Sequence, residues 1–383
     1  MAGRRIVIVG PAHPLRGGGM STFNERLAGA FQEAGDEVEI VSFSLQYPSF
    51  LFPGKSQFTN EPAPEGINIK PLINSVNPIS WVRTGNYIRH RKPDLVIFRY
   101  WLPFMGPALG TIARLIGRNR YSRILAITDN VVPHEKRPGD VPFTKYFLSA
   151  CHGFLTMSRA VQQDLKLFEP NKPSLYLPHP LYDNFGLAES KAEACTALGL
   201  DLNFKYLLFF GFIRAYKGLD LLLEAMAIPA LQAIPDLKLL IAGEFYEEAK
   251  PYHDLIEKHG LQDKLVLRTD FIPNAEVRHY FCAADLVVQP YKHATQSGVT
   301  QVAYHFNKPM VVTHVGGLAE LVPHGEVGYV VAPQPQEIAA AILDFYNNGR
   351  NEIYAQNIAR YKQRFSWSRF VAAVYELAAK VKP

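Results

Sequence analysis

The sequence predicts an α/β protein with two domains, each built around a doubly wound parallel sheet. Apolar runs such as "RIVIVG" and "DLVIFRY" are continuous rather than alternating, which is typical of parallel strands covered by helices on both faces. Helical patterns separate these runs, and the rhythm restarts after residue 203. A chain of 383 residues, 48% of them hydrophobic, is also too long for one ordinary core.

In the first half, strands and helices are expected to alternate. A helix over residues 19–34 follows three glycines and is closed by Gly35, and another helix is expected near residues 106–116. The apolar runs predict strands at residues 5–10, 37–43, 67–73, 94–100, 123–129 and 153–158.

The second half repeats this order after a break. Its strands are expected at residues 206–211, 237–243, 264–272, 285–290, 309–313 and 328–333. The break, from residue 177 to about residue 203, contains Pro178, Pro180 and Gly186 and reads as a hinge. We therefore predict domains over residues 1–185 and 186–365, with a cleft between them.

Composition narrows the class of protein. There is no apolar run long enough for a membrane span and no signal-peptide pattern, so a cytoplasmic protein is expected. The three cysteines are scattered, which argues against a disulfide framework and a zinc site. Residues 1–180 carry 21 Lys and Arg against 13 Asp and Glu, whereas the remainder carries 19 against 22. A basic half could face anionic lipid, nucleic acid or a phosphorylated substrate, or be an ordinary solvated surface.

Ligands of open parallel sheets bind at the carboxyl ends of the strands, so the loops there are the first candidate sites. After the first strand, "GPAHPLRGGGMSTF" brings Gly17, Gly18 and Gly19 to a helix N-terminus, which suits a phosphate. The spacing does not match the G-x-G-x-x-G fingerprint of dinucleotide-binding proteins.

A second candidate lies in "FFGFIRAYKGLD". Arg214 and Lys217 follow a strand, and Gly211 and Gly218 keep the loop thin, so both cations can reach one point above the sheet. Two cations there suit a diphosphate; the alternative is a pair of solvated loop charges.

A third candidate lies in "QPYKHATQSGVTQVAYHFNKP", where polar residues gather around a predicted helix start at Gly298. Hydroxyls and backbone N–H groups at such a place suit a phosphate or sugar hydroxyls. The polar residues are Thr295, Gln296, Ser297, Thr300 and Gln301.

Together these segments resemble the retaining GT-B glycosyltransferases of the group 1, or family 4, type. The matching segments are "RGGGMSTF", "GFIRAYKGLDLLLEAM", "LLIAGE", "FIPNAEVRHYFCAADLVVQPY", "KPMVVTHVGGLAELV" and "RFSWSRFVAAVYELA". The resemblance implies two Rossmann-like domains facing a cleft, with a C-terminal helix over residues 366–383 that crosses back to the first domain. It also implies a nucleotide-sugar donor in the second domain, a glycan or lipid-linked acceptor in the first, and transfer with retention. No cofactor and no nucleic-acid partner are expected.

Carried over by position, the resemblance gives the donor contacts. Arg214 and Lys217 would bind the diphosphate and stabilise its charge as it departs, which makes them catalytic as well. Since the sequence has no Asp-x-Asp, a metal is not expected to do so. The implied donor-binding residues are Gly18, Gly19, Gly211, Arg214, Lys217, Phe271, Ile272, Thr295, Gln296, Ser297, Gly298, Val299, Thr300 and Gln301.

The chain departs from this family in the third segment. Members usually carry Glu-x7-Glu there, but the corresponding pair is Ala294 and Val302 in one alignment and Thr295 and Ala303 in the other. Two alternatives therefore stay open: a nucleotide-sugar-binding protein with weakened catalysis, and a nucleotide-sugar epimerase using Asp129, His134 and Glu320.

In the first domain, Asp129 stands roughly where the family often has a histidine, and His134 follows in "TDNVVPHEKR". Both are candidate catalytic residues. Asp129 could orient a sugar hydroxyl or accept the acceptor's proton, or it could cap the next turn.

Aromatic residues of the basic domain bear on the acceptor. If Phe50, Phe52, Trp101 and Phe104 were exposed, they would suit a lipid-linked acceptor at the inner face of an anionic membrane. If buried, they are ordinary core, which is the usual place of aromatic side chains in compact domains.

Overall fold

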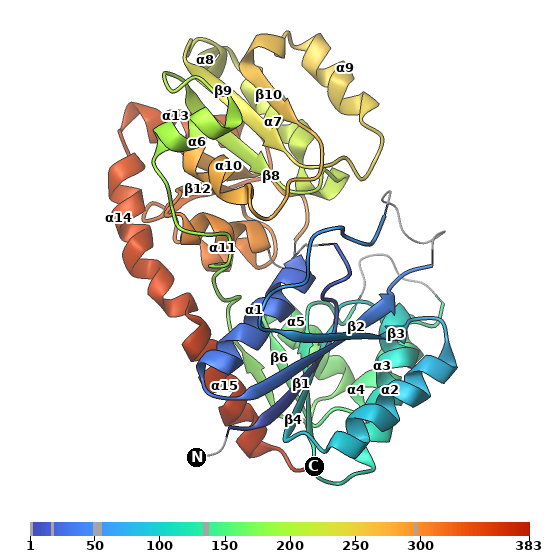
Figure 1. The fold of residues 1–383 in the computed structure, drawn as a ribbon. Coiled ribbons are helices and arrows are strands. Elements are labelled where there is room, and N and C mark those ends of the chain that lie inside the picture. Colours follow the sequence, from blue (N-terminus) through green and yellow to red (C-terminus); the bar gives the residue numbers. More distant parts are fainter. Residues whose placement is uncertain (1–2, 17–18, 49–55, 133–137, 295–296) are drawn as a thin grey trace. The chain divides into compact units, whose positions relative to one another are not determined.

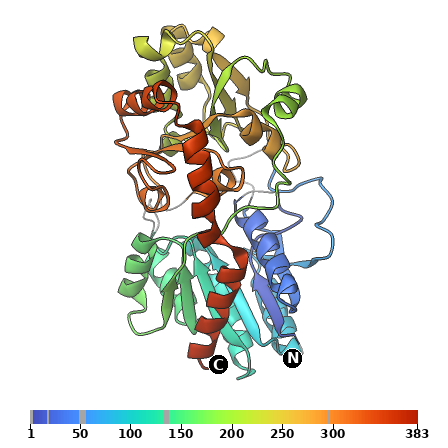
Figure 2. The ribbon, with the colours of Figure 1, turned by 90° about the vertical axis from the view of Figure 1, so that its left-hand side faces the viewer.

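The computed structural model describes residues 3–16, 19–48, 56–132, 138–294 and 297–383. The chain forms two compact units (Figures 1 and 2). Unit 1 contains residues 1–180 and 365–383, and unit 2 contains residues 181–364. The corresponding boundaries in the sequence analysis were 185/186 and 365/366.

Unit 1 is built on a parallel sheet whose seven strands lie in the order β3-β2-β1-β4-β5-β6-β7. The direction of strand addition reverses between β1 and β4, which is the mark of a doubly wound sheet. The strands are β1 (Arg5–Val9), β2 (Glu37–Leu45), β3 (Asn68–Asn74), β4 (Leu95–Tyr100), β5 (Arg123–Thr128), β6 (Gly153–Thr156) and β7 (Ser174–Tyr176).

Helices cover both faces of this sheet. A single core cluster joins one face of the sheet to Ile88, Ile112, Phe147 and Leu165, which come from four different helices. These helices are α2 (Pro78–Arg91), α3 (Gly106–Gly117), α4 (Asp140–Leu148) and α5 (Arg159–Phe168); a short 3-10 turn, η2 (Pro103–Met105), precedes α3.

The other face carries α1 (Gly19–Glu33) and α15 (Trp367–Lys380), which pack against each other. The rings of Trp367 and Phe370 lie 5.2 and 5.7 Å from the ring of Phe23 on α1, and Tyr375 hydrogen bonds to Asp36. The C-terminal helix therefore belongs to unit 1, as the family resemblance implied.

Unit 2 has a second parallel sheet, in the order β10-β9-β8-β11-β12-β13. Its strands are β8 (Lys205–Phe210), β9 (Leu237–Ala242), β10 (Leu265–Arg268), β11 (Leu286–Gln289), β12 (Met310–Thr313) and β13 (Gly328–Val331). Its helices are α6 (Lys191–Leu198), α7 (Leu219–Met226), α8 (Pro229–Gln232), α9 (Lys250–Lys258), α10 (Val277–Ala283), α11 (Gly298–His305), α12 (Leu318–Leu321), α13 (Pro335–Asn347) and α14 (Asn351–Tyr361), with 3-10 turns η3 (Ala215–Lys217), η4 (Gln262–Lys264) and η5 (Lys362–Phe365). The predicted α/β class with two doubly wound sheets is confirmed.

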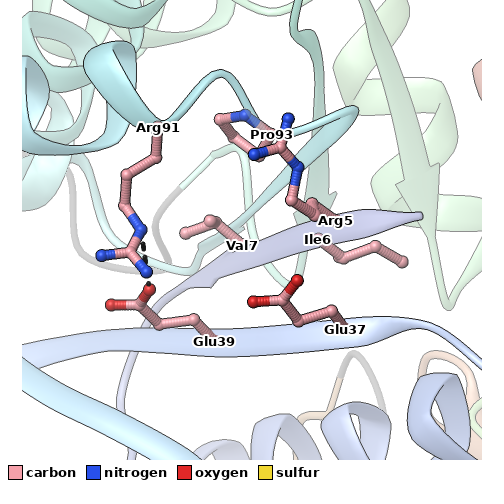
Figure 3. A pocket seen from close by; sticks show the side chains of 7 residues that line it. All are labelled: Arg5, Ile6, Val7, Glu37, Glu39, Arg91 and Pro93. Carbon is pink, nitrogen blue, oxygen red and sulfur yellow. Dashed lines mark ion pairs between the residues drawn. The ribbon is translucent and has the colours of Figure 1, made fainter. Parts of the chain in front are cut away.

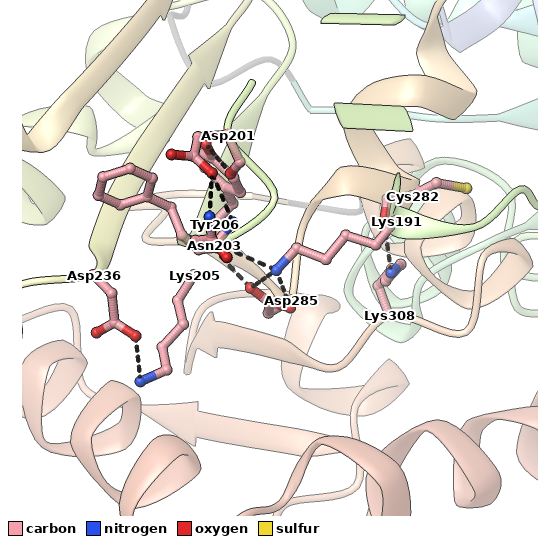
Figure 4. Close-up of polar contacts among 10 residues, drawn as sticks. Lys191, Asp201, Asn203, Lys205, Tyr206, Asp236, Cys282, Asp285 and Lys308 are labelled. Carbon is pink, nitrogen blue, oxygen red and sulfur yellow. Dashed lines mark hydrogen bonds and ion pairs between the residues drawn. The ribbon is translucent and has the colours of Figure 1, made fainter. Parts of the chain in front are cut away.

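An ion pair fastens α6 to the amino edge of this sheet (Figure 4). Lys191 Nζ lies 2.9 Å from both carboxylate oxygens of Asp285, and the backbone N–H of Tyr206 donates to the same carboxylate at 2.8 Å. Asp285 thus ties together the starts of β8 and β11 and the first helix of the unit.

Some elements differ from the sequence prediction. The strand expected over residues 264–272 ends at Arg268, because the chain turns away before Phe271 and Ile272. The stretch expected to be a hinge up to residue 203 contains α6, whose start is fixed by a capping box between Ser190 and Glu193 and whose end is closed by Gly199. Helices α2, α4 and α5 were not placed from the sequence.

Candidate functional site

The candidate donor site lies at the carboxyl edge of the unit 2 sheet. The order β9-β8-β11-β12 places the switch of direction between β8 and β11. The loop after β8 carries Arg214 and Lys217, and the loop after β11 leads into α11 at Gly298. Two of the three predicted candidate segments therefore flank the switch point, where open α/β sheets bind ligands.

Lys217 reaches back over the end of β8. A Cβ atom added to Gly211 would lie 2.9 Å from Lys217 Nζ and 3.9 Å from Val299 Cγ2. Gly211 also has a φ of 93°, and Gly218, after Lys217, has a φ of 69°. Glycine is needed at position 211 both for this backbone conformation and for the space that the ammonium group occupies.

In the described ranges, the two cations of this loop, Arg214 and Lys217, have no carboxylate partner, but the neighbouring Lys292 has one. Lys292 Nζ is paired with Asp220 at 2.6 Å. Neither Arg214 nor Lys217 forms an ion pair with a described residue, although Arg214 stacks with its guanidinium carbon 4.9 Å from the Tyr246 ring centre. Two adjacent positive groups without a counter-charge form a place that suits an anion.

Lys217 has an altered acidity. Burial and, to a smaller extent, the nearby charge of Arg214 lower its pKa to about 7. A lysine with this pKa gains a proton readily when an anion arrives, because a negative neighbour favours the charged form.

The loop after β9 supports the cationic loop, and the sequence analysis named no residue from it. The backbone N–H of Ala215 donates to Glu247 Oε2 at 2.8 Å, and Ile213 N–H donates to the Glu244 carbonyl at 2.9 Å. The rings of Phe212 and Tyr246 lie 4.2 Å apart. The segment "LLIAGE" was recognised as a family match, but nothing in it marked Tyr246 or Glu247.

The start of α11 closes the other side of the site. Ser297 is its N-cap residue, and the Ser297 hydroxyl lies 3.3 Å from the Tyr291 hydroxyl. A Cβ on Gly298 would lie 2.8 Å from a ring carbon of Tyr182, so only glycine fits there. Ser297, Gly298 and Val299 therefore lie at this edge of the sheet, as predicted.

Thr300 and Gln301 point into the protein. Both are fully buried, and the Thr300 hydroxyl donates to Gln289 Oε1 at 3.0 Å. In the described part of the chain, both amide atoms of Gln301 and the Nε2 atom of Gln289 have no hydrogen-bond partner. The predicted contact of Thr300 with a sugar is not supported by this geometry, since its hydroxyl is already engaged.

Four of the predicted site residues lie outside the described residues: Gly18, His134, Thr295 and Gln296. Gly19 is the first residue of α1 and is exposed. Phe271 and Ile272 are partly buried and follow β10 at the carboxyl edge of the unit 2 sheet.

In unit 1, Asp129 is held by an arginine that the sequence analysis missed. Arg99 Nε and Nη2 donate to the two carboxylate oxygens of Asp129 at 2.6 and 2.7 Å, and both side chains are buried. A carboxylate engaged in this bidentate pair is a poor general base. Arg99 was hidden in the apolar run "LVIFRY", which predicted a strand and nothing more.

The Arg99 guanidinium is stacked 4.1 Å from the centre of the Phe23 ring, and Phe23 packs edge-on against His179. Burial, and to a smaller extent the charge of Arg99, lower the pKa of His179 to about 3 against the opposing effect of its contact with the Pro180 carbonyl. His179 is therefore neutral near pH 7. Among described groups, Arg99 Nη1 and Asn24 Oδ1 have no hydrogen-bond partner.

The aromatic residues considered for the acceptor belong to the core where the structure describes them. Trp101 is buried and donates through Nε1 to the Tyr47 hydroxyl at 2.7 Å, and Phe104 packs against the same core cluster. Phe50 and Phe52 lie outside the described residues. An exposed aromatic patch that includes Trp101 is therefore ruled out.

A pocket of about 250 Å³ lies at the opposite, amino edge of the unit 1 sheet (Figure 3). Arg5 and Glu37 line it, and Arg91 Nε pairs with Glu39 at 3.4 Å. Its mixed charges and its position at the strand starts separate it from the carboxyl edge that carries the candidate residues.

Within the described ranges, three or more metal-ligating side chains do not gather at any point. The helices described here are each too short or too polar to cross a bilayer.

Comparison with known proteins shows what the second unit is similar to. Residues 204–348 match the family model described as glycosyl transferases group 1. This segment runs from β8 through α13 and includes the cationic loop and α11. This segment of the chain is similar to the group 1 glycosyltransferases, and the fold of the chain is GT-B.

Two curated relatives illustrate the match. A D-inositol 3-phosphate glycosyltransferase of Thermobispora bispora is 29% identical over 197 residues, which cover 49% of this chain and 46% of that protein. The lipopolysaccharide core biosynthesis mannosyltransferase LpsB of Rhizobium meliloti is 29% identical over 201 residues, which cover 49% of this chain and 55% of that protein. The chain thus spans about half the length of the curated relatives it matches.

Solved structures match over nearly the whole chain. The sucrose-phosphate synthase of Thermosynechococcus elongatus has a TM-score of 0.75 at 17% identity, covering 98% of this chain and 99% of that one. Anabaena HepE, solved in complex with UDP, has a TM-score of 0.72 at 16% identity, covering 97% and 99%. At such low identity these likenesses establish the fold alone.

Proposed function

We propose that the protein is a retaining glycosyltransferase that moves a sugar from a nucleotide-diphosphate sugar to a glycan or lipid-linked glycan. The reaction uses no metal ion and no other cofactor in this proposal. The protein would act in the cytoplasm, with contact to the inner face of an anionic membrane, and would serve polysaccharide biosynthesis.

One observation carries the donor assignment. Lys217 Nζ lies over Gly211 at the switch point of unit 2, next to Arg214, and the described carboxylates leave both cations unpaired. Bond breaking between the sugar and the diphosphate leaves negative charge on the departing nucleoside diphosphate. Fixed cations at that point stabilise the charge as it develops, which is the largest common contribution to catalysis of this kind.

The relatives support this choice of ligand. HepE was solved with UDP-glucose as well as with UDP, and the two curated relatives are named as glycosyltransferases. The matched family segment contains the proposed donor site.

Asp129 has a different role in this proposal from the one first considered. Because Arg99 engages both of its carboxylate oxygens, Asp129 acts as a positioning residue that holds the Arg99 guanidinium rather than as the base for the acceptor. His134 and the segment at Thr295 and Gln296 stay predictions from the sequence.

A second candidate is a nucleotide-sugar-binding protein with weak or no catalysis. It is favoured by one specific observation: neither alignment of the third segment gives a carboxylate, and the buried Gln301 supplies only a neutral amide nearby. A neutral amide cannot provide negative charge next to a positively charged sugar centre.

A panel of UDP-, GDP- and ADP-sugars separates these candidates. Thermal stabilisation together with release of the nucleoside diphosphate in the presence of acceptor glycans supports the transferase. Stabilisation without release on any acceptor supports the binding protein, and interconversion of the free nucleotide sugar supports an epimerase. The absence of stabilisation by every nucleotide sugar contradicts the donor assignment itself.

A further inference from the structure

The pocket at the amino edge of the unit 1 sheet lies between the starts of β1 and β2 and the end of α2 (Figure 3). Val7 and Pro93 are buried and give it an apolar lining. Arg5 and Glu37 are partners in the parallel register of β1 and β2, so both side chains stand on the same face of the sheet as Val7, at the exposed lip. The volume of about 250 Å³ lies below the about 300–1,000 Å³ of pockets for drug-sized ligands, so the pocket suits a smaller molecule.

One wall of the pocket is held by a buried carboxylate. Glu39 is only 6% exposed, accepts a hydrogen bond from the Tyr87 hydroxyl at 2.6 Å and lies 3.4 Å from Arg91 Nε. Arg91 Nη1 and Lys70 Nζ both donate to the same hydroxyl, at 2.8 and 2.6 Å. The Glu39 carboxylate is therefore fully engaged, and its role is to fix the Arg91 guanidinium. The Nη2 atom of Arg91 has no partner among the residues that the structure describes.

The charged groups at the lip keep free hydrogen-bonding capacity. In the ranges that the structure describes, the Glu37 carboxylate has neither an ion pair nor a hydrogen bond. The Arg5 guanidinium donates only through Nη2, to the Lys92 carbonyl at 3.3 Å. Lys92 ends α2 in a left-handed conformation with a φ of 46°, which non-glycine residues rarely adopt. This contact holds one edge of the Arg5 guanidinium and leaves its remaining N–H groups available.

The arrangement of these charges selects the kind of ligand. Figure 3 shows Arg5 and Arg91 on one side of the pocket and Glu37 across from them, on β2. A simple anion would pair with the arginines but would lie close to the unpaired Glu37 carboxylate. A simple cation would pair with Glu37 but would face two guanidinium groups. A zwitterion satisfies both sides, because guanidinium groups bind a carboxylate in a fork of hydrogen bonds and a carboxylate accepts from an ammonium group.

We propose that this pocket binds an α-amino acid with an apolar side chain. Its carboxylate lies between Arg5 and Arg91, its ammonium group contacts Glu37, and its side chain packs against Val7 and Pro93. The apolar lining selects such a side chain, because burial there removes apolar surface from water. The inference does not depend on the proposed function, since the pocket lies in unit 1 and the proposed donor site in unit 2. A ligand of this size is expected to bind with a Kd of about 1 mM.

Methyl NMR of the full chain with labelled valine tests the proposal, with L-leucine as the probe. The Val7 methyl signals should shift and saturate as L-leucine is added. The Val299 methyl signals, which report the Gly211 region of unit 2, should stay in place with L-leucine and shift with UDP. 4-Methylpentanoate lacks the ammonium group and 3-methylbutylamine lacks the carboxylate, so each should bind at least about tenfold more weakly than L-leucine.

Two variants remove one charge each from the lip. Glu37→Gln and Arg5→Gln should each weaken L-leucine binding about tenfold, the low end for a hydrogen bond to a charged group, because both side chains are exposed. The matched controls Glu65→Gln and Arg83→Gln remove the same charges at exposed positions outside the pocket and should leave binding unchanged. In all four variants the methyl signals away from the substitution should keep their positions, which shows that the chain is folded.

Several outcomes would overturn the proposal. These are an absence of Val7 shifts up to about 10 mM L-leucine, ten times the expected Kd; equal binding of either analogue; an equal loss of binding in the two controls; and shifts of Val299 in place of Val7. Tighter binding of D-glucuronate than of L-leucine would also overturn it, because the pocket would then be assigned to an acidic sugar. A missing response of Val299 to UDP, with L-leucine binding intact, would contradict the proposed function alone.

Discussion

The low pKa of Lys217 leads to a test of the donor site. With a pKa of about 7 in the unliganded protein, Lys217 is largely neutral at pH 8.5. A bound diphosphate favours the ammonium form and raises the pKa in the complex. Between the free and the bound pKa values, binding therefore takes up a proton, and the affinity for UDP should fall by up to tenfold for each unit of rising pH.

The size of the mutational effect follows from the contact. A hydrogen bond to a charged group contributes about 1.5–3 kcal/mol, so Lys217→Ala should weaken UDP binding by roughly 10-fold to 150-fold at pH 6.5. The loss should shrink toward pH 9, because the wild-type lysine is then neutral before binding.

Calorimetry measures both the UDP affinity and the number of protons taken up on binding. Titrations of UDP in two buffers with different heats of ionisation give the number of protons taken up, which should approach one near pH 8 and vanish in Lys217→Ala. The matched control is Lys205→Ala, which removes a lysine paired with Asp236 at 2.9 Å at the amino edge of the same sheet (Figure 4). A wild-type affinity that stays constant from pH 6.5 to 9, or proton uptake that persists in Lys217→Ala, would refute the reasoning.

Three other perturbations have expected outcomes. Gly211→Ala should lower UDP affinity because its Cβ enters the space of the Lys217 ammonium group. Its control is Gly199→Ala, at a φ of 65° with open space around it, which should cost about 1 kcal/mol of stability without changing UDP affinity. Calorimetry measures the affinity and urea unfolding the stability, and equal UDP affinity in both variants would contradict the steric account. Gln301→Met should raise the free energy of unfolding by about 1 kcal/mol, since two unpaired amide atoms leave the interior, and a lower midpoint in urea would count against this. Asp129→Asn should destabilise unit 1 by about 3–5 kcal/mol, because Arg99 is left as an unpaired buried charge. Adding Arg99→Met should recover part of this stability. An unchanged midpoint of urea unfolding would show that the pair is not coupled to folding.

The sequence predicted the parts of the fold that depend on periodicity. The continuous apolar strands and Gly35 after α1 lie where the patterns placed them, within a few residues, and the final helix lies where the family resemblance placed it. Helix α2 was missed because much of its sequence, "PISWVRTGNYIRHR", is polar, so no helical period of apolar residues stands out. Two of its apolar side chains, Ile79 and Val82, are exposed rather than buried.

The candidate site was predicted only in part. Strand-end position and flanking glycines were enough to mark Arg214 and Lys217, and the structure brings Lys217 together with Gly211 and Val299. The sequence did not show which polar side chains of the third segment are buried. Thr300 and Gln301 look like ligand contacts in the sequence, yet the turn of α11 directs them into the protein.

The pairing of Arg99 with Asp129 could not be predicted from the sequence. One arginine in an apolar strand gives no signal of its partner, because Asp129 follows 30 positions later and the two meet only when β4 and β5 pair side by side. The parallel register that aligns Tyr100 with Thr128 also places the residues around them at the same level.

The discontinuous make-up of unit 1 has a consequence for synthesis. The ribosome delivers residues 1–180 first, but the helix that covers Phe23 is translated only after all of unit 2. Until then, α1 alone covers this side of the nascent sheet, part of the apolar surface stays exposed, and residues 367–380 must return to cover it. A premature stop codon before residue 367 would therefore damage the portion of the protein that was made first.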